Sequence, residues 1–146
     1  MNKAIIGILL VLLLANCQRD EPQNLLVGTW RWEQSSGGVG VRIFEPRKGE
    51  NTYLTFKSNQ TFEVTRNDTL FVKGKYQTTN TRSIYSVQDA PAIELTEMVS
   101  PRQITDPNFV FSHLLGSTMV IIEITTSRLY VGDNNHDGYS SSFTRK

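Results

Sequence analysis

The stretch Val27-Gly28-Thr29-Trp30-Arg31-Trp32-Glu33-Gln34 decides the fold that we expect for this chain. Successive side chains of an extended strand point to opposite faces, so Trp30 and Trp32 lie on the same face. Two indole rings on one face predict a strand that covers a hydrophobic core. The expected fold therefore begins with this strand.

The rest of the chain continues as short runs rich in β-branched and aromatic residues, separated by polar turn residues. Turns spaced by about 8 to 12 residues are typical of an all-β sandwich or barrel. No long amphipathic helix is evident, which argues against parallel βαβ units. Closing an antiparallel sheet into a barrel removes its unpaired edges. We therefore predict an all-β, antiparallel up-and-down barrel of about eight strands, drawn from residues 27–34, 53–56, 61–64, 70–76, 83–88, 92–97, 118–125, 128–132 and 138–145.

Three of the connections are predicted as hairpins, with turns at residues 58–60, 67–68 and 126–127. A longer segment, residues 98–117, supports two interpretations. Asp106-Pro107 is a possible start of a short helix that ends at Gly116, whereas the parity of Phe109, Phe111 and His113 is that of a strand. Both interpretations stay open at this point.

The N-terminus carries a targeting signal. Met1-Asn2-Lys3 is a short positive segment, and the apolar run 4–15 that follows ends just before Cys17, the single cysteine. This run is too short to span a bilayer, which takes about 20 apolar residues, but it suits a signal peptide. The segment resembles a bacterial lipoprotein signal, which implies acylation of Cys17 before and after cleavage. A thiol used for the anchor is not available for a disulfide or a catalytic role.

These features predict the organisation of the chain: a signal peptide at residues 1–16, an acylated tether at 17–24 and a barrel domain at 25–146. The resemblance implies a bacterial cell envelope protein, held in the outer membrane by its lipids. Gln18-Arg19-Asp20-Glu21 resembles the charged tags that carry some lipoproteins to the outer face of that membrane. A solvated linker is the alternative reading of these four residues.

Within the domain, Gly28 and Trp30 form a Gly-x-Trp signature at the start of the first strand, and a long glycine-containing loop and a series of hairpins follow it. This arrangement resembles the lipocalin family and its bacterial lipocalin-like lipoproteins. The resemblance implies that Trp30 closes one end of the barrel beneath a basic residue from the last strand. Arg145 matches that position, and Arg128 is the competing candidate. It also implies that the loop at residues 35–51 partly covers the open end.

A lipocalin-like barrel implies a cup that binds a small apolar or amphipathic molecule, without catalysis and without a cofactor. Aromatic side chains are the candidates for lining it, although core packing alone also accounts for them. The alternative is a barrel that is packed solid and docks another envelope protein. The predicted ligand pocket consists of Tyr53, Phe56, Phe62, Phe71, Tyr76 and Tyr85.

A polar turn near the C-terminus is a weak candidate for a calcium site, because Asp133, Asn135 and Asp137 occupy alternate positions before Gly138. Position 12 of such a loop needs a bidentate glutamate, and Thr144 stands there instead. A tight turn explains the same residues. We therefore expect no metal, and neither zinc-ligand spacing nor a catalytic set of Ser, His and acidic residues is found.

The composition agrees with a globular protein, since 38% of the 146 residues are hydrophobic and 20% are charged. Removing the signal peptide takes away Lys3 and leaves equal numbers of basic and acidic residues. A neutral domain gives no reason to expect nucleic acid as a partner.

Overall fold

The structure is a computed structural model that describes residues 22–101 and 118–146. These residues form one short helix and nine strands in a single sheet: α2 (Pro22–Leu26), β1 (Gly28–Gly37), β2 (Arg42–Phe44), β3 (Thr52–Phe56), β4 (Thr61–Arg66), β5 (Thr69–Arg82), β6 (Asp89–Val99), β7 (Met119–Ile124), β8 (Arg128–Asp133) and β9 (Tyr139–Arg145). Among the described residues, no helix has the length and apolar character needed to cross a membrane.

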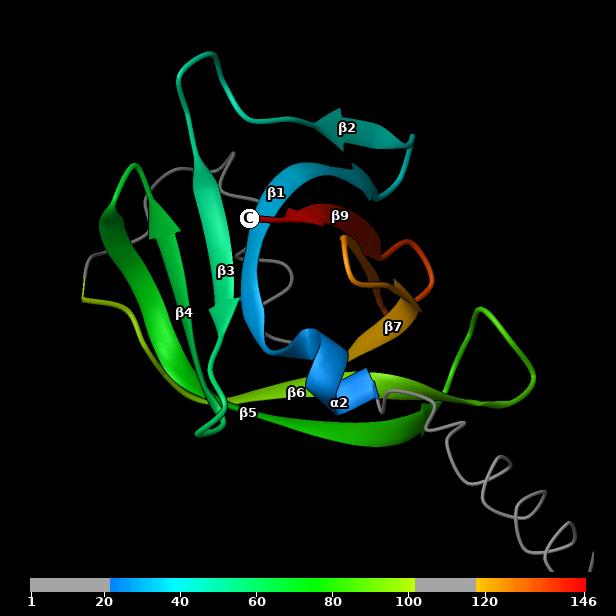
Figure 1. The fold of residues 1–146 in the computed structure, drawn as a ribbon. Helices are drawn as coiled ribbons and strands as arrows, with labels where there is room; N and C mark the ends of the chain where they lie inside the picture. Colours follow the sequence, from blue (N-terminus) through cyan, green and yellow to red (C-terminus); the bar gives the residue numbers. More distant parts are fainter. Residues whose placement is uncertain (1–21, 102–117) are drawn as a thin grey trace, which may run out of the picture.

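The sheet closes on itself as an antiparallel barrel. Each strand from β3 to β8 pairs with the strand that follows it, and β1 pairs with both β3 and β9. Eight strands thus form a ring, while β2 pairs with the end of β1 outside it (Figure 1). The predicted all-β, up-and-down barrel is confirmed, with β2 and α2 as elements that the sequence did not predict.

The β4–β5 turn lies at Asn67-Asp68, as predicted from the sequence. Both residues have positive φ angles, 47° and 60°, which is the backbone of the two-residue turns that match the twist of a hairpin. Asn and Asp tolerate this conformation better than most residues.

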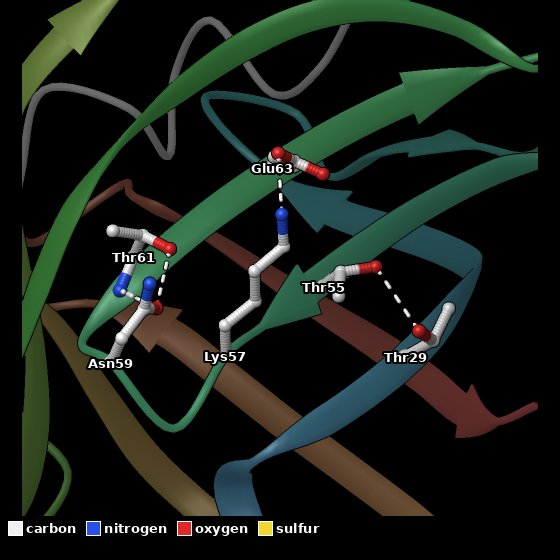
Figure 2. Close-up of polar contacts among 6 residues, drawn as sticks. All are labelled: Thr29, Thr55, Lys57, Asn59, Thr61 and Glu63. Atoms are coloured by element: carbon white, nitrogen blue, oxygen red, sulfur yellow. Dashed lines mark hydrogen bonds and ion pairs between the residues drawn. The ribbon is translucent and has the colours of Figure 1, made fainter.

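The β3–β4 hairpin is held by its own side chains (Figure 2). The Asn59 carboxamide oxygen accepts hydrogen bonds from the backbone N–H and the hydroxyl of Thr61. Lys57 and Glu63 form an ion pair of 2.6 Å on the same hairpin. The Thr29 and Thr55 hydroxyls lie 3.1 Å apart and connect β1 to β3.

The prediction of a strand at residues 83–88 is wrong. β5 ends at Arg82 and β6 begins at Asp89, so these residues form the loop between the two strands. The loop is held from outside: the Asn134 side chain accepts a hydrogen bond from the backbone N–H of Ile84 and donates one to the carbonyl of Arg82. Pro91 lies in β6 opposite Asn80. The register of β6 with β7 runs over Ala92 and Ile93 and does not include Pro91.

The inward-facing side chains pack into one core cluster. Alternation places Leu54 and Phe56 of β3, Phe62 and Val64 of β4, and Val72 and Tyr76 of β5 on the inner face. The cluster runs through Leu26, Trp30, Trp32, Leu54, Phe56, Phe62, Val64, Val72, Tyr76, Ile93, Met119, Ile121, Leu129, Val131 and Phe143.

One end of the barrel is closed by Trp30, which is fully buried. Its indole N–H donates to the Leu26 carbonyl of α2 at 2.8 Å. The Arg145 guanidinium lies 4.3 Å from the centre of the Trp30 ring and donates hydrogen bonds to the carbonyls of Val27 and Leu25. Arg145, rather than the exposed Arg128, therefore takes the position over the indole.

Gly28 makes this closure possible. Its φ angle of 147° is one that side-chain-bearing residues rarely adopt, and a Cβ atom there would collide with the Arg145 guanidinium. The Gly-x-Trp pattern thus has a steric reason. The glycine leaves room for the cation that covers the tryptophan two residues later.

We expect Arg145→Ala to lower the free energy of unfolding by about 2 to 4 kcal/mol, because it removes a cation–π contact and leaves two carbonyls without their donor. Arg128→Ala, on the neighbouring strand, is the matched control and should change stability by no more than about 0.5 kcal/mol. Urea unfolding of the purified variants measures both values. Equal losses in the two variants would show that the closure contributes no more than an exposed arginine.

Candidate functional site

The candidate site lies at the edge of β1 where this strand changes neighbour. β1 pairs with β3 as far as Arg31, and with β2 from Ser35 onward. Between these two points the chain leaves a cavity of about 260 Å³, which we call the mouth cavity. It is lined by Trp32, Ile43, Phe44, Glu45, Arg47, Glu50 and Arg66.

One wall of the mouth cavity is apolar and well fixed. Trp32 is 5% exposed, and its indole N–H donates to the Ser35 hydroxyl at 2.9 Å. The Ser35 and Ser141 hydroxyls are 2.5 Å apart, and both residues are fully buried. A bulge between Trp32 and Gln34 in the pairing with β9 turns Ser35 to the inner face. The tryptophan ring is thereby held in one orientation.

Aromatic packing extends this wall to β2. The Phe44 and Tyr139 rings lie 5.9 Å apart at a tilt of 58°, which connects β2 to β9 across the end of β1, the strand with which both pair. Tilted aromatic pairs add stability beyond their buried area.

The opposite wall is charged. Arg66 and Glu50 form an ion pair of 3.0 Å, and their side chains are only 18% and 11% exposed. The Thr52 hydroxyl donates to Glu50, and Arg66 lies over the Phe71 ring at 5.9 Å from its centre. Partial burial strengthens an ion pair relative to one in open solvent. The cavity therefore presents oriented cationic and anionic groups beside aromatic rings.

The backbone behind this ion pair is rigid. Asn67 donates its backbone N–H to the carbonyl of Asn51, and its side-chain oxygen accepts the backbone N–H of Asn51, both at 2.9 Å. These two bonds fix the residue after Glu50 to the residue after Arg66. The charged wall is thus positioned before any ligand arrives.

The six aromatic residues predicted as a pocket lie in different parts of the described structure. Phe56, Phe62 and Tyr76 are buried in the core, where the Phe56 and Tyr76 rings meet edge to face at 4.8 Å. The Tyr76 hydroxyl donates to the carbonyl of Lys57, and burial raises the pKa of this phenol above its ordinary value.

The other three aromatics lie elsewhere. The Tyr53 ring packs under the Lys146 ammonium at 4.5 Å, beside an outer cleft between β1, β3 and β9. Phe71 lies in a bulge of β5 under Arg66, and Tyr85 lies in the β5–β6 loop. The physical reason is the two-residue period of a strand, which sends Tyr53 and Phe56 to opposite faces.

The weak calcium candidate is a hydrogen-bonded turn. The Asp133 carboxylate accepts the backbone N–H of Tyr139 at 3.1 Å, and the carbonyl of Asn135 accepts the backbone N–H of Gly138. Asp137 adopts a φ angle of 61°, as a tight turn requires. In residues 22–101 and 118–146, no three His, Cys, Asp or Glu side chains gather in a way that suits a metal ion.

Three sequence predictions lie outside the described residues: the signal peptide with the lipidation site Cys17, the tag Gln18-Arg19-Asp20-Glu21, and the choice between helix and strand for most of residues 98–117, of which only 98–101 are described. Residues 98 and 99 belong to β6. The mouth cavity was not predicted. Trp32 was assigned correctly to the inner face, but the charged residues at positions 45, 47, 50 and 66 carry no spacing that marks a site.

Comparisons with known proteins give one similar structure. The crystal structure of a lipocalin-like protein from Bacteroides uniformis matches 84% of this chain and 99% of its own, with 18% sequence identity and a TM-score of 0.47. No family model matches the chain. No curated protein matches it either.

We expect Ser35→Ala to lower the free energy of unfolding by about 1 to 3 kcal/mol, because the buried Trp32 N–H then has no hydroxyl to accept its hydrogen bond. Ser36→Ala, at the next position of β1, controls for the loss of a serine hydroxyl from this strand. Guanidinium unfolding followed by tryptophan fluorescence measures the difference. A variant as stable as wild type would mean that Ser35 does not hold the indole.

Proposed function

We propose that this protein is a membrane-anchored, non-catalytic binding protein that takes a small amphipathic acid in the mouth cavity. The observation that carries the proposal is the joining of Trp32 and Phe44 with the Arg66–Glu50 ion pair in one space of about 260 Å³. The rings offer an apolar surface, and guanidinium groups donate paired hydrogen bonds to carboxylates and phosphates.

The charged wall favours an amphipathic ligand over a purely apolar one. A hydrocarbon placed against Arg66 and Glu50 would displace water from charged groups without replacing its hydrogen bonds, which is unfavourable. An acidic group supplies acceptors to Arg66 and Arg47, while an apolar tail lies on Trp32. The volume lies below the roughly 300 to 1,000 Å³ of sites for drug-sized ligands, so the ligand is small or enters only in part.

The packed core supports a site at the mouth rather than deep in the barrel. Trp30, Phe62 and Phe143 fill the space between the strands and are at most 1% exposed. The same packing favours the alternative function, a solid barrel that docks another envelope protein. The two functions differ in whether a small molecule remains on the purified protein.

Native mass spectrometry of residues 18–146, purified from the host organism, tests the ligand. We expect a reproducible adduct of small mass that Arg66→Gln lowers at least about tenfold, since a charged hydrogen bond contributes about 1.5 to 3 kcal/mol. Arg128→Gln, an exposed cation on β8, should leave the adduct unchanged. A protein without an adduct that co-purifies with another envelope protein would favour docking.

The anchor is tested separately in the full chain. We expect Cys17→Ser to accumulate as a precursor of higher mass that takes up no radiolabelled palmitate, because serine offers no thiol to the acylating enzyme. Asn16→Ala keeps the thiol and should still be labelled and cleaved. Normal cleavage and labelling of Cys17→Ser would refute the assignment of the anchor.

A further inference from the structure

The turn between β1 and β2 and the short strand β2 itself carry aliphatic side chains that are exposed to water. Val39, Val41 and Ile43 are 84%, 72% and 63% exposed, and they alternate with Gly40 and Arg42 along the chain. We call residues 38–48 the tip loop. Because β2 pairs outside the ring of strands, the tip loop lies at the margin of the barrel (Figure 1).

The backbone of the tip loop is strained at a residue that does not pack. Val41 has a φ angle of 45°, and its N–H donates to the Gly38 carbonyl at 3.1 Å to close the turn. This conformation is unfavourable for a β-branched residue and free of cost for glycine. Since the Val41 side chain is largely exposed, core packing does not offset the strain. Strain of this kind is often found at functional sites.

Cationic residues lie next to these aliphatic residues in the sequence. Arg42, Arg47 and Lys48 are all exposed, and Glu45 is the acidic residue among them, so the tip loop carries a net positive charge. Exposed aliphatic groups next to cations suit a surface that is apolar beneath and anionic on top. A bilayer with acidic headgroups has this chemistry.

The shape of the tip loop also favours lipid over protein. A stable protein interface buries about 800 Å² on each partner in a continuous patch. Three aliphatic side chains on a narrow turn present a far smaller surface area, and each side chain projects separately. A lipid surface accepts single aliphatic side chains, each adding its own transfer free energy.

We propose that the tip loop docks on anionic lipid, with Val39 and Val41 entering the interfacial layer while Arg42 and Lys48 contact headgroup phosphates. The lipid contact uses side chains that do not line the mouth cavity, although the tip loop also supplies Ile43, Phe44, Glu45 and Arg47 to the lining of that cavity. It also requires no acylation of Cys17.

The test uses residues 18–146, which keep the whole barrel because every residue of the core cluster lies between Leu26 and Phe143. The protein is sedimented with vesicles of phosphatidylcholine and phosphatidylglycerol, and with vesicles of phosphatidylcholine alone. We expect binding to the mixed vesicles that weakens with salt. The double variant Val39→Asp/Val41→Asp should lower the partition coefficient at least about tenfold. Val87→Asp, in the exposed β5–β6 loop, is the matched control and should bind as wild type does.

Val41→Gly separates docking from folding. Glycine relieves the strain, so the melting temperature should stay the same or rise while vesicle binding falls. Wild-type protein that stays in the supernatant with the mixed vesicles, equal binding to both kinds of vesicle, or an equal loss in Val87→Asp would each overturn the proposal.

Discussion

The contact between Arg145 and Trp30 is the constraint on which the barrel depends. It joins the last strand to the first, and it places a cation on the ring that closes one end. The same guanidinium satisfies two carbonyls where α2 leads into β1, so the helix is held against the barrel as well. The contact stands at one end of the β1–β9 pairing, and without that pairing the two strands would be the edges of an open sheet, with unpaired backbone groups.

Trp30 closes one end of the barrel, and the candidate site lies at the other end. Around Trp30 the Arg145 guanidinium is already bound to the ring and to two backbone carbonyls. Further charged groups gather where β1 changes partner from β3 to β2, and among them the Arg66–Glu50 ion pair of 3.0 Å is largely buried. The tip loop belongs to the same segment of the chain, between β1 and β3, so both proposals concern one region.

Local rules account for the elements that the sequence predicted. Asn67-Asp68 turns the chain because both residues accept positive φ angles, and that preference needs no tertiary contact. The loop at residues 83–88 was mistaken for a strand because Ile84, Tyr85 and Val87 have the composition of one. Contacts with residues distant in the sequence override this local preference. Asn134 forms hydrogen bonds with the backbone at Ile84 and Arg82, and Tyr85 donates to the carbonyl of Asp133.

The sequence by itself determined the spacing of most strands and the face on which most of their side chains lie, because a period of two is a property of the extended backbone alone. It also placed Trp30 and Trp32 on the inner face. Only the tertiary structure decided which of these side chains meet, because register and bulges bring distant strands together. The bulge in β1 brings Ser35 to Ser141, and the gap between β2 and β3 exposes one edge of Trp32 to a cavity. Neither is a property of any segment taken alone.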